Sequence, residues 1–588
     1  MRILYVHFCW FFFMLSAFTT SLFAAISLSS SYSSLYVSLP FFSFPEHQFV
    51  VSFYLDWMST WFITIILFIS IVISIYSYNY MSPYSKPLYF IVLTSLFVLS
   101  MLLVVTISDL FFLILGWDGL GVVSFFLIVY YQNQRSVTSG MFTLLINRLG
   151  DRFFLISIAL FSFYSQDYFS WRYRRVEALL LLFLILTFIT KSAIYPFSPW
   201  LPIAMAAPTP ISALVHSSTL VTAGLYLIIR FSTYLYSSYS LMAILLSLSL
   251  YTSFYAGLNT IFETDLKKLI ALSTLSHLGF IGMAYSAGLL QLAFFHILTH
   301  ALFKSLLFMT MGDIIINLNH SQDIRYLSSG AIYTPVSCWI MYVSLFNLLG
   351  LPMLRGFYSK DFVLECMNYS SSCVIVIFII LLNVFFTYYY TYQLFYYSFS
   401  SNKVFSFQII HQLGLFHTCL IITLGVLTLL FPGFLLTNIY SSVLYLPVPS
   451  SFKFFPVFLN LFTFIFLLLF LKQLSFKSKN LHSYFSTMMF LSPFIMSVMS
   501  NLYYNSVFYL VKSFELGLIN YSFNSFLPNV VSSSSKWLLL LCNSSPLRTI
   551  LFSLPLVFLL LSFLLSNITN YIWLLLIIFL TGLNRLSV

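Results

Sequence analysis

Apolar residues fill long runs of the chain that no charged residue interrupts. Four of these runs, at residues 87–108, 231–262, 404–452 and 549–584, contain no Asp, Glu, Lys or Arg. Each run is long enough for at least one transmembrane helix, which needs about 20 apolar residues. The runs lack the alternation of apolar and polar positions that is typical of outer-membrane barrels. The pattern therefore predicts an all-α polytopic membrane protein.

The same pattern predicts about 15 transmembrane helices along the chain. Residues 1–86 would hold the N-terminal membrane helices: one over roughly 3–28, a Ser- and Pro-rich loop to about 55, and a further helix from 57. The first residues are as hydrophobic as a signal peptide, but no small-residue cleavage site follows, so a membrane helix is the simpler interpretation. Residues 399–471 would add further membrane helices, and residues 551–588 a C-terminal transmembrane anchor.

Residues 472–550 have a different pattern of polar and apolar residues, because polar residues interrupt their apolar runs every few positions. This stretch is too polar for ordinary membrane helices and too apolar for a soluble domain. A long amphipathic helix that lies laterally, along the membrane or against partner subunits, fits such a pattern. One or two poor membrane spans joined by loops remain the alternative around residues 488–499.

Two segments concentrate helix-breaking residues where helices are expected to cross the membrane. Five prolines fall within residues 195–210, and Pro352 lies between Gly350 and Gly356. Proline removes a backbone donor and kinks a helix, and the freed carbonyl groups then need protein or water partners inside a membrane. A pair of broken helices in corresponding positions is typical of inverted repeats around a polar path. We therefore predict two such repeats, at residues 87–232 and 233–398.

Composition supports the membrane class and excludes several others. Of the 588 residues, 61% are hydrophobic and 7% are charged, whereas a soluble domain carries about a quarter charged residues. Lys and Arg outnumber Asp and Glu by 25 to 14, but they are scattered in short loops, as orientation signals are. No basic stripe or nucleic-acid-binding motif accompanies them, so we expect no nucleic-acid partner.

Nothing in the sequence indicates a cofactor or metal bound by this chain. The six cysteines do not have the spacing of zinc or iron–sulfur ligands, and neither a dinucleotide-binding nor a Walker motif is present. If the chain serves a redox enzyme, the redox cofactors lie on other subunits. The 69 Phe and 41 Tyr against 19 Gly suggest an AT-rich genome, which favours an organelle-encoded product.

Ionisable residues inside membrane helices are costly and indicate function by default. Six of them lie in or beside predicted spans: Asp118, Lys191, His216, Lys304, Lys360 and Asp361. His296 and His300 precede Lys304 at intervals of four residues, so the three side chains share one helix face over about 12 Å. This row predicts a path for ions or protons.

The residue types suit proton transfer. Imidazole takes up and releases protons near neutral pH, and a buried lysine holds its proton more firmly when a carboxylate is close. Pairing Asp118 with Lys191 would hold Lys191 charged, and separating them would release its proton. Two plainer interpretations stay open: a membrane histidine is more often a helix–helix hydrogen bonder, and Lys360 with Asp361 can form a static pair.

Several segments are similar to one known family. Residues 198–230, SPWLPIAMAAPTPISALVHSSTLVTAGLYLIIR, resemble the signature of the proton-translocating membrane subunits of complex I (NADH-ubiquinone oxidoreductase) and of the related multisubunit cation/proton antiporters. The segments HILTHALFKSLLFM, DLKKLIALSTLSHLGF, FYLDWMS, GWDGLG and NRLGD resemble the chain 5 members in particular. The resemblance is strong over about residues 53–390 and weaker in the C-terminal third.

The resemblance implies roles for the matching residues. Asp118 and Lys191 would form the coupling pair, Lys304 would be the central proton carrier, and Lys360 the carrier nearest the exit. The residues that would connect or support these carriers are His216, His296, His300, Asp361, Arg148 and Asp151.

Four positions depart from the family pattern. Asp118 replaces a glutamate, so its shorter side chain would need a water to reach Lys191. Ile203 stands where aspartate is common, Gln393 where arginine is usual, and His277 where glutamine is typical. The region before residue 53 also has room for one clear span where many relatives have two.

The resemblance implies a proton-pumping core subunit of complex I in the mitochondrial inner membrane, enzymatic only as part of NADH:ubiquinone reductase. NADH, FMN, iron–sulfur clusters and ubiquinone would bind other subunits, and the partners would be the antiporter-like chain 4, accessory subunits and lipids. The nearest alternative is a subunit of a multisubunit cation/proton antiporter. A plastid homologue and a structural module with a defunct channel are further alternatives, and the retained lysines argue against the latter.

Overall fold

The computed structural model describes residues 2–399 except 44–47, 82–86, 165–177, 319, 328–333, 352–353, 355 and 371–373. It also describes residues 415–438 and 488–510, together with isolated positions at 456–465, 484–485 and 528–536. Residue contacts divide the chain into two compact units, Met1–Met496 and Ser497–Val588. All the named helices and strands belong to the first unit, apart from the part of helix α21 beyond Met496.

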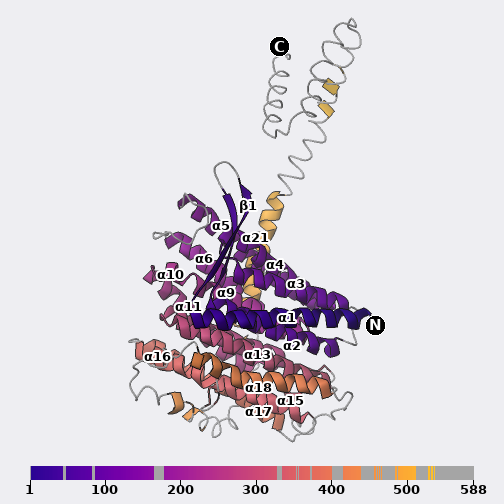
Figure 1. The fold of residues 1–588 in the computed structure, drawn as a ribbon, viewed down its shortest axis with the longest axis vertical. Helices are drawn as coiled ribbons and strands as arrows, with labels where there is room; N and C mark the ends of the chain where they lie inside the picture. The colour runs from indigo at the N-terminus through magenta and orange to yellow at the C-terminus, as the bar shows by residue number, and fades with distance from the viewer. Residues whose placement is uncertain are drawn as a thin grey trace. The chain divides into compact units, whose positions relative to one another are not determined.

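The first unit is built mainly of long apolar helices (Figure 1). Ten helices in the described part of the chain are long and apolar enough to cross a membrane. The helices of the N-terminal part are α1 (Arg2–Ser31), α2 (Trp57–Tyr80), α3 (Pro87–Thr106), α4 (Leu110–Ile128), α5 (Gln134–Tyr164) and α6 (Ala178–Lys191). The prediction of a helical, polytopic membrane protein is confirmed; the total of about 15 spans stays a prediction.

The predicted loop before residue 55 is wrong, because this segment forms a β-hairpin. Strands β1 (Leu35–Ser43) and β2 (Gln48–Leu55) pair antiparallel, with an irregularity between Pro40 and Phe42. Their Val, Tyr and Phe residues favour a strand, and the serines and prolines obscured that pattern in the sequence. The Ser52 amide donates to Asp109 Oδ2 at 2.6 Å, which ties the hairpin to the start of α4.

Helix α13 (Leu290–Asn317) lies at the centre of the first unit (Figure 1). It follows α11 (Tyr239–Phe262) and α12 (Leu266–Ser286) through short turns and packs against α12, α2 and α18 (Leu415–Asn438). Its spanning segment is wholly buried, polar side chains included. Polar groups in such a position need partners inside the protein, which makes α13 the first place to look for a polar path.

The first predicted helix break is confirmed. Helix α6 ends at Lys191, and a cis peptide bond joins Tyr195 to Pro196. Two short turns, α7 (Trp200–Ile203) and η2 (Ala204–Ala206), follow the break. The span Thr209–Arg230 then consists of α8 (Thr209–Ile211), the π-helix η3 (Ser212–Thr219) and α9 (Leu220–Arg230), and the short α10 (Ser232–Leu235) comes after it. The Trp200 indole donates to the Thr190 carbonyl at 2.9 Å, so a side chain satisfies one backbone group freed by the break.

The second predicted break is confirmed as well. Helix α15 (Pro335–Leu349) ends at Gly350, whose φ of +79° is left-handed, a conformation that glycine adopts freely. The π-helix η5 (Phe357–Asp361) follows and continues into α16 (Phe362–Ser370), and α17 (Val374–Phe399) is the next described helix. A Cβ at Gly356 would collide with the Asn347 carbonyl oxygen, so only glycine lets the two halves of the break approach.

The division into repeats at 87–232 and 233–398 stays a prediction, as does the inversion of one relative to the other. Helix α21 (Leu491–Leu510) begins within the predicted lateral stretch of 472–550. Most of that stretch, much of 399–471 and the whole predicted anchor at 551–588 lie outside the described residues.

Candidate functional site

Lys191 is fully buried at the end of α6. Its ammonium group donates a hydrogen bond to the main-chain carbonyl of Trp117 on α4 and lies 4.0 Å from the centroid of the Trp117 ring. A carbonyl oxygen and an aromatic face both stabilise a cation without neutralising it. Lys191 is therefore held beside Asp118, the next residue along α4, by contacts that do not use the carboxylate.

Asp118 contacts an arginine instead of Lys191. Its Oδ1 lies 2.8 Å from a terminal guanidinium nitrogen of Arg148 on α5, and the same nitrogen lies 3.3 Å from Asp151 Oδ2. No ion pair joins Asp118 to Lys191 among the described residues. The sequence predicts that Asp118 reaches Lys191 only through a water, and in the structure Asp118 instead belongs to an Asp118–Arg148–Asp151 triad, which the long reach of arginine favours.

His216 lies on the π-helix η3, fully buried, with its ring edge-on to Trp200 at 6.1 Å between centroids. Neither ring nitrogen has a hydrogen-bond partner among the described residues. A π-helical turn inside a span is frequent at functional sites. No hydrogen bond, ion pair or ring contact joins His216 to another predicted site residue among the described residues.

The row on α13 forms as expected, with His296, His300 and Lys304 all buried. The Lys304 ammonium group donates to Ser273 Oγ on α12 at 2.7 Å and lies 5.7 Å from the centroid of the Tyr390 ring on α17. No carboxylate pairs with Lys304 in the described part of the chain. The row is therefore surrounded by hydroxyl, aromatic and imidazole groups.

A third histidine, His277 on α12, joins this row. Its Nδ1 lies 3.4 Å from His296 Nε2, and its ring centroid lies 5.5 Å from that of His300. In the sequence, His277 stands out only as a departure from the family pattern. Ser273 and His277 are four residues apart on one helix, and this spacing could have shown that both lie on the same face of α12.

The row continues to Lys360 through a serine on the second break. His296 Nδ1 lies 3.2 Å from Ser359 Oγ, and the neighbouring Lys360 donates to the Leu348 carbonyl at 3.2 Å and to Thr387 Oγ1 at 3.1 Å. A cavity of about 20 Å³, lined in part by His277 and Lys360, lies beside this point. A cavity of this size holds one water molecule.

Lys360 and Asp361 do not form the static pair that the sequence left open, since no ion pair joins them among the described residues. Asp361 is buried, and its Oδ2 accepts a hydrogen bond from the Asn460 amide at 3.3 Å. The two neighbouring side chains therefore contact different parts of the protein, and Lys360 remains directed at the α12–α17 side.

Two further buried acids are not evident from the sequence. Asp313 on α13 is 2% exposed and lies beside Tyr76. Glu263, in the turn between α11 and α12, is 6% exposed, and burial raises its pKa to about 7. Both follow apolar runs, but the sequence alone does not show that other helices cover them. Within the described residues, no group of three or more His, Cys, Asp or Glu side chains is placed to hold a metal ion.

Solved structures have a fold similar to that of this chain. The chain is similar to a subunit of an Mrp complex from Dietzia (TM-score 0.65, 22% identity, 88% of this chain and 62% of that one). It is also similar to a chain of respiratory complex I from Thermus thermophilus (TM-score 0.60, 20% identity, 74% and 94%). The fold is thus that of an antiporter-like membrane subunit.

Sequence relatives identify the family. Residues 107–387 match the family described as NADH:quinone oxidoreductase/Mrp antiporter, and residues 41–90 match the N-terminus of complex I chain 5. NADH-ubiquinone oxidoreductase chain 5 of Anopheles gambiae is 43% identical over 400 residues, covering 66% of this chain and 68% of that one. The Anopheles arabiensis relative is 47% identical over 337 residues, covering 56% and 86%. The chain belongs to the NADH-ubiquinone oxidoreductase chain 5 family.

The match does not extend over whole relatives. For chain 5 of Anopheles quadrimaculatus, 44% identical over 380 residues, it covers 65% of the relative and 63% of this chain. The chain thus spans about two thirds of the length of such relatives.

Proposed function

We propose that this chain is a proton-translocating core membrane subunit of respiratory complex I in the mitochondrial inner membrane, encoded by the organelle. It would couple electron transfer from NADH to ubiquinone to proton movement, with NADH, FMN, the iron–sulfur clusters and ubiquinone bound by other subunits. The observation that carries the proposal is the buried row from Lys304 to Lys360, because such a row of proton-binding groups inside a membrane protein is costly without function.

The route we propose runs along one face of α13 and then across to η5. A proton on Lys304 would pass to His300, then through His277 and His296 toward Ser359 and Lys360. The His277–His296 and His296–Ser359 contacts, at 3.4 and 3.2 Å, are close to hydrogen-bond length. Transfer between His300 and its neighbours needs a bridging water or a rotation of the ring, because both His300 nitrogens lack partners among the described residues.

The region around Asp118, Arg148 and Lys191 would control when protons move. Asp118 binds Arg148 at 2.8 Å while Lys191 rests against the Trp117 carbonyl. A shift of Asp118 from Arg148 to Lys191 would strengthen the hold of Lys191 on its proton, and the return would weaken it. The exchange of one carboxylate between two cations thus replaces the simple coupling pair expected from the sequence.

Exposure of this triad suggests where a partner lies. The side chains of Arg148 and Asp118 are 44% and 41% exposed, although Asp118 lies within the apolar span Leu110–Tyr131. Charges that face lipid are costly, so we propose that another membrane subunit covers this face. The adjacent antiporter-like chain 4, accessory subunits and membrane lipids are the proposed partners.

Two measurements test the proposal, and the first is membership of the complex. Gently solubilised membranes would be separated on a native gel, probed for this chain and stained for NADH oxidation. We expect the chain in a very large NADH-oxidising band. A smaller band without that activity would contradict membership and favour the antiporter alternative, which sodium-dependent proton exchange would then identify.

The second measurement is proton pumping by the purified complex in proteoliposomes. Lys304→Ala should abolish pumping while the complex stays assembled and the route for electrons on other subunits stays intact. Thr310→Val is the matched control, since Thr310 is equally buried on α13 and its hydroxyl bonds only within that helix, to the Leu306 and Leu307 carbonyls at 3.1 and 3.0 Å. Normal pumping by Lys304→Ala would rule out the proposed row.

A further inference from the structure

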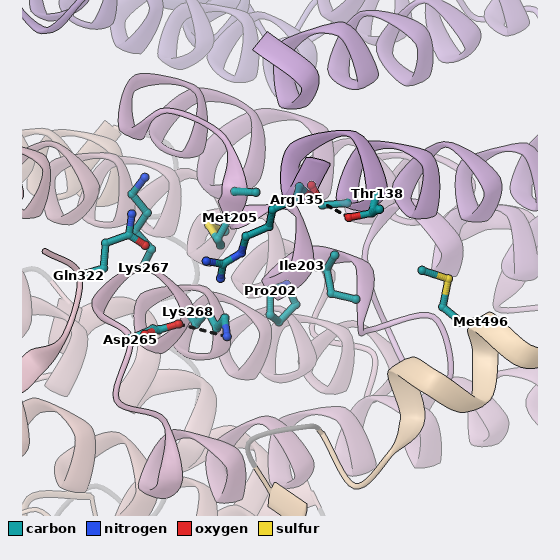
Figure 2. A pocket seen from close by; sticks show the side chains of 12 residues that line it. Arg135, Thr138, Pro202, Ile203, Met205, Asp265, Lys267, Lys268, Gln322 and Met496 are labelled. Atoms are coloured by element: carbon teal, nitrogen blue, oxygen red, sulfur yellow. Dashed lines mark hydrogen bonds and ion pairs between the residues drawn. The ribbon is translucent and has the colours of Figure 1, made fainter. Parts of the chain in front are cut away.

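A second polar cavity lies apart from the proton row, where α5 and α12 begin (Figure 2). Its volume is about 220 Å³. The segment between the first break and η3 forms one wall, and α21 contributes Met496. The residues that line it are Arg135, Thr138, Ser139, Pro202, Ile203, Met205, Ala206, Asp265, Lys267, Lys268, Gln322 and Met496. None of them was predicted as a site residue from the sequence.

The cavity carries an excess of positive charge. Three of its side chains are basic and one is acidic. Asp265 is already engaged, since its Oδ2 lies 3.1 Å from the Lys268 ammonium group. Neither Arg135 nor Lys267 has an ion pair among the described residues. Two cations therefore face the cavity without a counter-charge.

Lys267 differs from the ordinary orientation charges at the ends of membrane helices. A charge that only orients a helix stays in water, but Lys267 is 5% exposed. Its ammonium group donates one hydrogen bond, to the Ala207 carbonyl at 3.0 Å, and a neutral acceptor does not offset the cost of burying a cation. An anion in the cavity would supply the missing charge.

The remaining residues that line the cavity are partly polar and partly apolar. Thr138, Ser139 and Gln322 bring hydroxyl and amide groups, while Pro202, Ile203 and Met205 form an apolar side. The volume corresponds to roughly seven water molecules at about 30 Å³ each, which is enough for a phosphate group and part of a glycerol unit. Arg135 and Lys267 are each the second residue of a long helix, where the helix dipole also favours an anion.

We propose that this cavity, which we name the Arg135–Lys267 cavity, binds a phosphate-bearing anion. Arg135 and Lys267 would neutralise the phosphate, and the apolar side formed by Pro202, Ile203 and Met205 would contact the carbon chain attached to the phosphate. Basic pockets at the ends of membrane helices bind phospholipid head groups in this way, and a free phosphate ion has the same recognition chemistry. Photolabelling with a lipid and binding of inorganic phosphate separate the two sources.

The intact purified complex would be exposed to a phosphatidylglycerol analogue that carries a photoreactive diazirine next to the head group. Labelled peptides are then mapped by mass spectrometry. We expect labelling at residues 202–206, displaced by unlabelled phosphatidylglycerol but not by phosphatidylcholine. Radiolabelled inorganic phosphate, added without lipid, tests the alternative source on the same preparation.

Substitution of Arg135 makes the test specific. Arg135 is exposed, so Arg135→Gln should leave the fold intact, and the loss of one charge-assisted contact should weaken binding about tenfold. Arg325→Gln is the matched control, because Arg325 lies three residues after Gln322, on the 3-10 helix η4 (Ile324–Leu327), outside the lining, and pairs with Asp323 at 3.4 Å.

Each outcome decides. Labelling that Arg135→Gln weakens and Arg325→Gln does not supports the lipid source. Phosphate binding with the same pattern of variants, without lipid labelling, supports the free ion. Absence of both, or equal effects of both substitutions, overturns the proposal while leaving the proton row untouched.

Discussion

Lys191 and Lys304 are both fully buried, yet their surroundings differ. Lys191 lies beside a triad of charged groups whose arginine is 44% exposed, and its own contacts are a backbone carbonyl and an aromatic face. Lys304 meets a serine hydroxyl and a tyrosine ring, with histidines on its own helix and no carboxylate paired to it in the described part of the chain.

The difference suggests that the regions of Lys191 and Lys304 have different roles in proton transfer. Charges near the surface respond to a neighbouring subunit, so the region of Lys191 is suited to receive a signal. The hydroxyl and imidazole groups around Lys304 can both donate and accept hydrogen bonds, so that region is suited to pass protons on. Four predictions break or sharpen this contrast, from the largest expected effect to the smallest.

Lys191→Met should reduce proton pumping roughly a hundredfold, in line with the loss of one proton-transferring group. The measurement is pumping by the complex in proteoliposomes, compared with its rate of NADH oxidation. Thr187→Val, one turn earlier on α6, is the control, because the buried Thr187 hydroxyl only bonds to the Leu184 carbonyl. Unchanged pumping would remove Lys191 from the mechanism and leave Lys304 alone.

Arg148→Gln should release Asp118 toward Lys191 and reduce pumping roughly tenfold, a smaller loss because all the proton carriers remain. If Arg148 acts only by holding Asp118, adding Asp118→Asn should cause little further loss, as expected for coupled residues. Arg152→Gln is the control: Arg152 is exposed on the same helix and forms no ion pair among the described residues. Additive losses would contradict a shared role.

His277→Gln should reduce pumping about threefold, since an amide keeps a hydrogen bond but does not carry a proton near neutral pH. The reduction should appear in the proton-to-electron ratio and not in assembly of the complex. Ser276→Ala is the control, because Ser276 lines the same small cavity and its hydroxyl bonds within α12. An unchanged ratio would make His277 a packing residue.

Glu263 should make the stability of the second half depend on pH. Burial raises its pKa from 4.5 to about 7, so the folded state binds this proton more tightly than the unfolded state does. The contribution of Glu263 to stability is then fully present below about pH 4.5 and is lost as the pH rises to about 7. Glu263→Gln should raise the thermal midpoint at pH 8 by a few degrees and leave it unchanged at pH 4.5; equal midpoints at pH 8 would contradict this.

Much of this architecture follows from the sequence, because membrane burial leaves strong patterns. The prolines around Pro199 and the glycines around Pro352 mark both breaks, and the four-residue spacing up to Lys304 places the row on one helix face. These are local signals. The β-hairpin was not predicted because Pro40 and several serines interrupt the alternation of apolar and polar residues that marks a strand.

The contacts that the sequence did not predict join residues far apart in the chain. The Arg148–Asp118 pair joins residues 30 positions apart and the Lys191–Trp117 contact residues 74 apart, so both depend on how α4, α5 and α6 pack. His277 faces His296 from another helix for the same reason. Sequence spacing describes one helix at a time, and it does not tell which face of the next helix lies opposite.

The main-chain acceptor of Lys191 has a genetic consequence. Because the carbonyl belongs to the backbone of Trp117, no side-chain replacement at that position deletes it. A mutation that weakens this hydrogen bond must instead tilt α4. The sensitive positions are two glycines where α4 packs against α3: a Cβ at Gly116 would lie 2.7 Å from Val104 Cγ2, and a Cβ at Gly119 would lie 3.0 Å from Ser100 Cβ. A screen for uncoupled mutants should therefore recover uncharged substitutions at these two glycines. A Cβ at Gly116 would also lie 2.8 Å from the Val104 backbone nitrogen, so a second-site suppressor, Ser100→Gly, is expected for substitutions at Gly119 alone.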